Sequence, residues 1–286
     1  MNAGEMVDVA ERRTRLRSMW GSVAGGWNEH AAFVEARGAA VTEKLLELTS
    51  PQPGERLLEL ACGAGDVGIA AADLVGEAGQ VVLSDVAPAM TAVAAARAAA
   101  LGLRNVSTRV LDLEEIDEPD ASYDVVVCRE GLMLVVDPDR AAREIRRVLR
   151  PGGRVALSVW GPRERNPWLG VVFDSVSAEL GVPMPPAGIP GPFSLDDPGR
   201  LAGVLVDARF TGIDVGEVPT PYRAASVEEW WTRTAALAGP LAQRLAVLPE
   251  PAARALHQRA RRAIGAYETS AGLDIPGVSL VASATR

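Results

Sequence analysis

This 286-residue chain is poor in lysine, histidine and cysteine, three residue types that often carry catalysis or bind metals. It has one lysine, Lys44, two histidines, His30 and His257, and two cysteines, Cys62 and Cys128. Two cysteines without metal-ligand spacing indicate neither a disulfide framework nor a zinc site. No cluster of histidines and carboxylates indicates a catalytic metal either, so we expect none.

Long apolar runs and excess positive charge are also missing. No stretch reaches the ~18 apolar residues of a membrane helix, and no apolar segment follows the arginines near the N-terminus, as a secretory signal would require. The net charge is −8, whereas proteins that bind nucleic acids usually carry a basic patch. We therefore expect no membrane span and no nucleic-acid partner. The lack of a disulfide framework makes the reducing cytoplasm the simplest setting, and we expect a monomer or homodimer.

The most informative feature present is a glycine-rich turn. The apolar run 57–61 ends near Gly63 and Gly65, a helix-like segment follows, and the next apolar run, 81–84, ends in Asp85. Glycine adopts positive φ at little steric cost, and without a Cβ it lets a ligand lie directly on the backbone. The pattern predicts strand, turn, helix and strand around a nucleoside cofactor.

The turn alone leaves two cofactor classes open. Gly63, Gly65 and Gly68 match the G-x-G-x-x-G pattern of dinucleotide sites, and Asp85 is placed to bind ribose hydroxyls in either class. Glu59, however, lies inside the first predicted strand, which is normally apolar in the NAD version. An acid there can reach the amino group of a methionine moiety, which favours S-adenosylmethionine.

Strands and helices are predicted to alternate through the middle of the chain. Alternation of this kind indicates an α/β fold with a parallel sheet, which binds ligands beyond the carboxyl ends of its strands. The strands are predicted at about 56–61, 80–85, 106–110, 123–128 and 154–160, and the helices between them at about 67–75, 88–101 and 138–150.

Two segments together carry a family resemblance: Glu-Leu-Ala-Cys-Gly-Ala-Gly-Asp at 59–66 and Leu-Arg-Pro-Gly-Gly-Arg-Val at 149–155. The chain resembles the class I S-adenosylmethionine-dependent methyltransferases, in particular the ubiquinone/menaquinone-biosynthesis group and its small-molecule relatives. The resemblance covers about residues 56–160. It implies S-adenosylmethionine as the cofactor and a Rossmann-like, mostly parallel seven-stranded sheet with helices on both faces.

The same resemblance implies how the chain is divided. Residues 1–54 would form an N-terminal helical cap, residues 55–218 with 277–286 the methyltransferase core, and residues 219–276 a helical lid inserted before the last strand. The lid tryptophans, Trp230 and Trp231, would suit an apolar or aromatic acceptor, or would simply form the core of the insertion.

The resemblance also implies a set of cofactor-binding residues. Asp85 would accept hydrogen bonds from both ribose hydroxyls, Asp112 would accept one from the adenine amino group, and Trp27 would close over the sulfonium. Each of these residues also has a structural alternative. Asp85 would then cap a helix, Asp112 would be one member of an acidic cluster, and Trp27 would be an ordinary helix-packing residue. The remaining predicted contacts are Glu59, Ala61, Gly63, Gly65, Val86, Met90, Leu113, Cys128 and Arg129.

Methyl transfer requires a general base only if the nucleophile arrives protonated. His30, in the cap, and Glu130, after the fourth predicted strand, are the candidates. As alternatives, His30 would be a packing residue and Glu130 an ion-pairing acid. We expect metal-independent methyl transfer to a small organic acceptor, such as a quinol, a phenol, or a polyketide- or terpenoid-like molecule.

Two other functions stay open. One is an NAD-dependent oxidoreductase, which the glycine pattern favours but Glu59 does not. A Tyr-x-x-x-Lys catalytic pair is also missing, because Lys44 is the only lysine. The other is a relative that binds the cofactor without catalysis.

Overall fold

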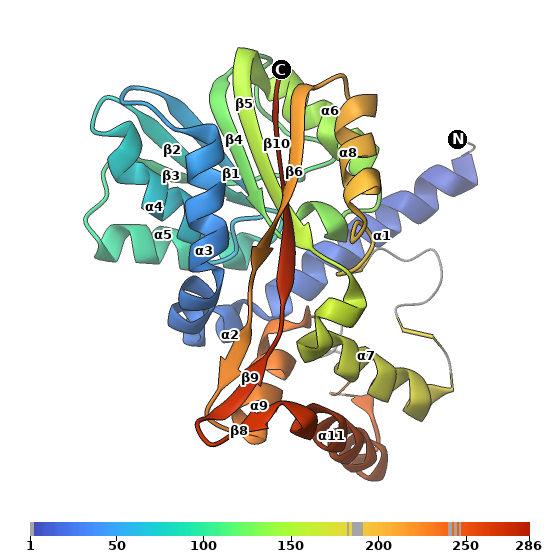
Figure 1. Ribbon diagram of the computed structural model, residues 1–286. Coiled ribbons are helices and arrows are strands. Elements are labelled where there is room, and N and C mark those ends of the chain that lie inside the picture. Colours follow the sequence, from blue (N-terminus) through green and yellow to red (C-terminus); the bar gives the residue numbers. More distant parts are fainter. Residues whose placement is uncertain (1–2, 182, 185–190, 240–241, 243–244, 246) are drawn as a thin grey trace.

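The computed structural model describes residues 3–286 except 182, 185–190, 240–241, 243–244 and 246. Its centre is a seven-stranded sheet with the order β3-β2-β1-β4-β5-β10-β6 (Figure 1). The pairs among β1 to β5 are parallel, and β10 runs antiparallel to both β5 and β6. The strands are β1 Arg56–Leu60, β2 Gln80–Asp85, β3 Val106–Val110, β4 Tyr123–Arg129, β5 Leu149–Trp160, β6 Thr211–Pro219 and β10 Val278–Thr285. This confirms the predicted fold class.

Helices cover both faces of the sheet because its central strands are apolar on both sides. Buried side chains of α3, α4 and α5 pack on one face with those of β1 and β2, and α6 and α8 pack on the other. Continuous burial of this kind is typical of parallel sheets. The helices are α3 Ala31–Thr49, α4 Asp66–Val75, α5 Pro88–Ala100, α6 Pro138–Val148 and α8 Pro198–Asp207.

Helix α6 shows how local sequence sets an element's limits. Pro138 occupies the first turn, and the Asp137 carboxylate accepts a hydrogen bond from the Arg140 N–H at 2.8 Å, which caps the helix. The helix was predicted to extend to residue 150 but ends at Val148. Leu149 is already extended, and β5 begins there.

Beyond the sheet lies a smaller unit made of helices and short strands (Figure 1). Here α7 (Pro167–Leu180) packs on α11 (Glu250–Ile264), next to α9 (Val227–Leu237). Three short strands pair in the order β7-β9-β8: β7 Tyr222–Ala224, β8 Glu268–Thr269 and β9 Gly272–Ile275. The lid was predicted to be helical, and these strands are too short to give a clear two-residue period. Short 3-10 helices lie at Leu132–Leu134, Arg163–Arg165 and Gly265–Tyr267.

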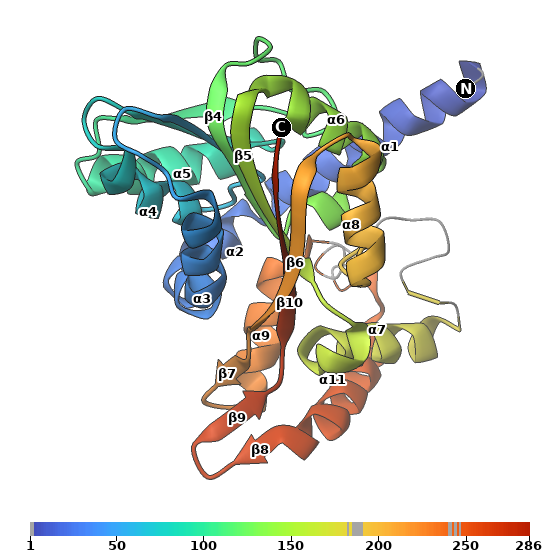
Figure 2. The same cartoon turned by 45° about the horizontal axis from the view of Figure 1, so that its top comes forward.

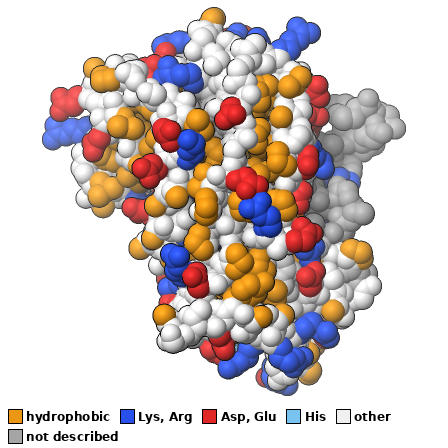
Figure 3. Space-filling view, viewed as in Figure 1, with side chains coloured by type: hydrophobic (Ala, Val, Ile, Leu, Met, Phe, Trp, Pro, Cys, Tyr) orange, Lys and Arg blue, Asp and Glu red, His pale blue; other side chains and the backbone are white. Residues whose placement is uncertain are grey.

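The N-terminal helices α1 (Ala3–Ser22) and α2 (Ala24–Glu29) lie across the end of the sheet where the parallel strands finish (Figure 2). Both contact α5, and α2 also contacts α9. The helical cap thus touches the core and the smaller unit. On the face of Figure 3, acidic and basic side chains are interspersed with hydrophobic ones.

Candidate cofactor and acceptor site

The loop after β1 has the backbone that the glycine pattern predicts. Ala61, Gly63 and Gly65 all have positive φ, at 50°, 51° and 86°. Gly65 is the N-cap of α4, which begins at Asp66. The loop therefore places the amino end of α4 at the carboxyl ends of the strands. The partial positive charge of that helix end favours a ligand group with negative charge.

Asp85 lies beside this loop at the end of β2 and is only 7% exposed. One of its carboxylate oxygens accepts from the Gly63 N–H at 3.1 Å, and the other accepts from the Ala87 N–H at 2.9 Å. Burial raises the pKa of Asp85, while the backbone donors oppose that shift. Each oxygen still has lone-pair capacity, so the carboxylate fits a vicinal diol such as that of a ribose.

Glu59 points to the first turn of α4. Its Oε2 accepts from the Gly68 N–H at 2.7 Å, and the residue is 2% exposed. A Cβ on Gly68 would lie 2.8 Å from this oxygen and 2.2 Å from Leu83 Cδ2. The third glycine of the pattern is therefore a packing residue. Glu59 was predicted to reach the amino group of a methionine moiety. Its hydrogen bond with the Gly68 N–H could not be predicted from the sequence, because it depends on where α4 lies relative to β1.

A buried ion-pair cluster holds the other side of the loop, and the sequence analysis missed it. Asp66 pairs with Arg97 through one oxygen and with Arg129 through the other, both at 2.5 Å. Arg129 also donates to Thr42 Oγ1 at 2.9 Å. Arg129 was predicted to be a cofactor contact, and its guanidinium joins β4, α3 and the loop.

The predicted adenine acceptor, Asp112, is bound by the cap. Its Oδ2 accepts from Arg13 of α1 at 2.7–2.9 Å, and its Oδ1 accepts from the Glu114 N–H at 2.9 Å. Arg13 also pairs with Glu114 and Glu115, each at 3.2 Å. Binding of an adenine amino group to Asp112 would have to displace Arg13.

We expect Arg13→Ala to tighten the binding of S-adenosylhomocysteine by up to about fivefold, because Asp112 would no longer be held by a competing cation. A partly exposed ion pair of this type contributes ~1 kcal/mol or less. Isothermal titration calorimetry measures the change, with Arg15→Ala, an exposed arginine on the same helix, as control. Weaker binding by Arg13→Ala would show that Arg13 belongs to the bound state instead.

Trp27 of α2 closes over the glycine loop. Its ring carbon Cζ3 lies 3.1 Å from where a Cβ on Gly63 would be, and its indole N–H donates to the Leu237 carbonyl at 3.1 Å. Trp20 and Trp27 both pack on a small buried cluster that includes Ala87 and Met90. Of the other predicted cofactor contacts, Met90 and Leu113 are buried, and Val86 is half-buried.

The remaining predicted site residues differ in their surroundings. Burial raises the pKa of the Cys128 thiol to about 12, so it is a neutral packing group. His30 lies between α2 and α3, and its imidazole has no hydrogen bond to any residue that the structure describes. Glu130 directly follows β4 and accepts from Ser279 Oγ at 3.2 Å. Glu130 therefore lies at the carboxyl ends of the strands and within a polar network.

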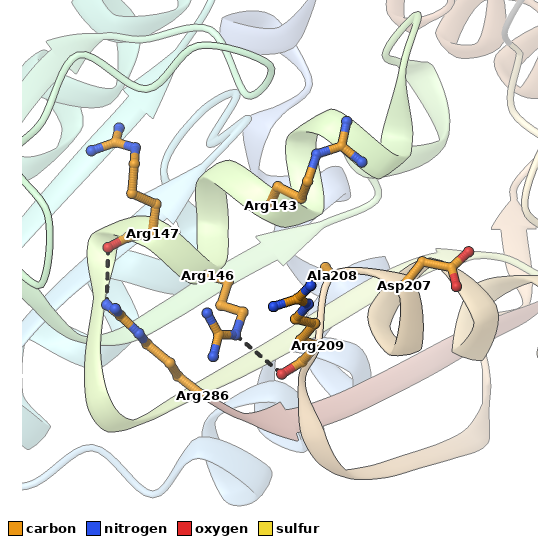
Figure 4. A pocket seen from close by; sticks show the side chains of 7 residues that line it. All are labelled: Arg143, Arg146, Arg147, Asp207, Ala208, Arg209 and Arg286. Carbon is orange, nitrogen blue, oxygen red and sulfur yellow. Dashed lines mark hydrogen bonds between the residues drawn. The ribbon is translucent and has the colours of Figure 1, made fainter.

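A cavity of about 410 Å³ lies elsewhere (Figure 4). Arg286 follows β10, whose Thr285 pairs with Arg154 at the other end of β5 from Trp160. The cavity is therefore at the opposite end of the sheet from the glycine loop. Arg146 and Arg286 donate to main-chain carbonyls there. It is lined by Arg143, Arg146, Arg147, Asp207, Ala208, Arg209 and Arg286.

Within the described ranges, no helix has the length and apolar character needed to cross a membrane. The same ranges contain no group of three histidine, cysteine or acidic side chains arranged to hold a metal ion.

Comparisons with known proteins point the same way as this geometry. Residues 51–167 match a family model described as a methyltransferase domain. The chain is 34% identical over 197 residues to nocamycin O-methyltransferase of Saccharothrix syringae, covering 66% of this chain and 70% of that protein. It is 33% identical over 155 residues to a ubiquinone/menaquinone biosynthesis C-methyltransferase of Teredinibacter turnerae, covering 54% of this chain and 62% of that one.

Among solved structures, a putative methyltransferase of Bacillus halodurans superimposes with a TM-score of 0.58 at 18% identity. The match covers 85% of this chain and 97% of that chain, and it shows a shared fold.

Proposed function

Since the chain belongs to the class I S-adenosylmethionine-dependent methyltransferases, we propose that its acceptor is a small organic molecule methylated at the carboxyl ends of β1, β2 and β4. One observation supports this location for methyl transfer. Asp85 and the Gly63 N–H are joined at 3.1 Å beneath the ring of Trp27. A buried diol acceptor, glycines that admit a ligand and an aromatic cover thus lie together.

In this proposal, the bound cofactor supplies a methyl group already activated by a positively charged sulfur. The protein has to bind, orient and exclude water, and positioning alone can supply ~7–11 kcal/mol of the barrier. Asp85 would hold the ribose hydroxyls, Gly63 and Gly65 the methionine and ribose portions, and Val86, Met90 and Leu113 the adenine. Trp27 would cover the sulfonium, where a cation–π contact contributes ~0.5–2 kcal/mol.

The other predicted contacts have different tasks in this proposal. Glu59 would act indirectly by fixing the first turn of α4, and Arg129 by fixing the loop through Asp66. Ala61 and Cys128 would shape the wall next to the methyl group. Asp112 would bind adenine after Arg13 has moved away. Glu130 is the better placed of the two candidate bases, because its carboxylate has a polar partner at the strand ends, whereas the His30 imidazole has none among the described residues.

We also propose the partners and setting that the sequence predicts. The relatives are named for a C-methyl and an O-methyl transfer, which supports small-molecule acceptors. With a net charge of −8, the protein is not expected to act on nucleic acid. We expect it to work in the cytoplasm as a monomer or homodimer.

Calorimetric titration with S-adenosylmethionine, S-adenosylhomocysteine and NAD tests this proposal. We expect micromolar binding of both sulfur-containing ligands and none of NAD, because β1 carries Glu59, whereas the corresponding strand is normally apolar in NAD sites. Binding of NAD without binding of either sulfur-containing ligand would overturn the proposed function.

A further inference from the structure

The guanidinium of Arg37 lies in an enclosure of aromatic rings above the strand ends. Its Cζ is 4.0 Å from the ring centroid of Trp168, 4.6 Å from that of Trp160 and 5.1 Å from that of Tyr222. All three rings are buried. Burial lowers the pKa of Arg37 to about 10, which still leaves it charged at neutral pH. The positive charge of Arg37 is thus held in apolar, aromatic surroundings.

One donor of this cation has no partner. Nε of Arg37 is out of contact with solvent and bonds to no residue that the structure describes. Buried donors without an acceptor are rare in folded proteins, and they mark a cost or a missing partner. An acceptor atom from a ligand would satisfy this one.

Glu130 provides the matching acid. It has φ of +59°, a left-handed conformation that is uncommon for residues other than glycine and concentrates at functional sites. Its backbone N–H is held by the Ser158 carbonyl at 2.9 Å. Only one of its carboxylate oxygens, Oε1, is hydrogen-bonded to a described residue, Ser279.

A chain of polar groups joins Arg37 to Glu130. Arg37 Nη2 donates to the Thr220 carbonyl at 3.5 Å, and Thr220 Oγ1 lies 3.4 Å from Ser279 Oγ. Ser279 Oγ in turn donates to Glu130 at 3.2 Å. Within the described chain, Arg37 and Glu130 form no direct ion pair, although each influences the pKa of the other. Arg37 and Glu130, both half-buried, thus belong to one polar network, and each has a polar atom without a partner among the described residues.

This network adjoins the cofactor loop. Gly38, the next residue of α3, lies so close to Arg129 that a Cβ there would be 2.3 Å from its Nη1. Arg129 is bound to Asp66, the first residue of α4 after the glycine loop. The network therefore faces the end of the sheet where the methyl group would be presented.

We propose that Arg37 and Glu130 form the acceptor subsite and that it takes a planar acceptor with an ionisable hydroxyl group, a phenol or an enol. Arg37 binds the acceptor and Glu130 receives its proton. This inference rests on the proposed function. As the acceptor O–H bond breaks, its proton passes to the Glu130 carboxylate. The oxygen forms a bond to the methyl carbon while the methyl–sulfur bond breaks and leaves its electron pair on sulfur. Glu130 then releases the proton to water.

The test measures binding of 1-naphthol and of its methyl ether, 1-methoxynaphthalene, to the full-length protein saturated with S-adenosylhomocysteine. Quenching of the tryptophans beside Arg37 reports binding. We expect the wild type to prefer 1-naphthol, and Arg37→Met and Glu130→Gln each to weaken 1-naphthol binding ~10-fold or more, as loss of a hydrogen bond to a charged group does. Methyl ether binding should not change.

The affinity for S-adenosylhomocysteine, measured in each variant, separates this inference from the proposed function. It should remain at the wild-type value if the variants are folded. Arg56→Met is the matched control, since Arg56 also lies over a ring, that of Tyr123 at 5.0 Å, at the start of β1. Equal binding of the two probes by the wild type, or of 1-naphthol by wild type and variants, would overturn the subsite. Failure of the wild type to bind S-adenosylhomocysteine would instead overturn the proposed function.

Discussion

Replacement of Asp85 by alanine is expected to weaken S-adenosylhomocysteine binding about 100-fold or more. The carboxylate would lose two charge-assisted hydrogen bonds to ribose hydroxyls, each contributing ~1.5–3 kcal/mol. Asp85 also holds the Gly63 and Ala87 N–H groups, so the loop would be less ordered before binding. Isothermal titration calorimetry measures the loss, and thermal unfolding shows whether the variant is folded.

Asp73→Ala serves as the control, because Asp73 is an exposed acid on α4, the helix that follows the loop. Asp85→Asn separates charge from shape, since the amide can accept only through its oxygen. We expect the affinity of Asp85→Asn for S-adenosylhomocysteine to lie between those of Asp85→Ala and the wild type. If Asp85→Ala binds with the wild-type affinity in a folded protein, Asp85 is not the ribose acceptor and only the loop contact remains.

The second large effect concerns Glu59 and pH. Burial raises the pKa of Glu59 to about 8, from 4.5. Because the folded-state value lies above the unfolded-state value, the folded protein retains a proton that the unfolded chain has lost between about pH 5 and pH 8. The stabilisation is complete below the unfolded pKa and is lost as pH rises through the folded pKa. The slope from this group is about 1.4 kcal/mol per pH unit.

Urea unfolding of wild type and Glu59→Gln at intervals from pH 5 to pH 8 isolates this contribution. Glutamine keeps an oxygen that can accept from the Gly68 N–H but does not titrate. We expect the unfolding free energy of the wild type to fall with rising pH more steeply than that of the variant. Burial also raises the pKa of Asp85 and Glu130, and taking the difference between the two proteins removes their contribution. Parallel curves would show that Glu59 is ionised in the folded protein.

The sequence determined the elements whose cause is local. Apolar runs predicted β1, β2 and β4, and the glycines predicted a turn with positive φ at residues 63 and 65, because few other residues adopt that backbone without strain. Asp85 could be located because it ends a buried strand next to that turn. The mostly parallel sheet also followed, since alternating strands and helices indicate one.

The tertiary structure alone decided which side chains meet across the chain. Trp27 binds the carbonyl of Leu237, 210 positions later, and Arg13 binds Asp112, 99 positions later. Arg37, which no sequence motif marks, comes to lie among three rings from β5, α7 and β7. Local patterns record the conformational preference of a segment, whereas these contacts depend on how the packed helices and sheet orient distant segments. For this reason the cofactor loop was predictable from residues 57–85, and the proposed acceptor subsite was not.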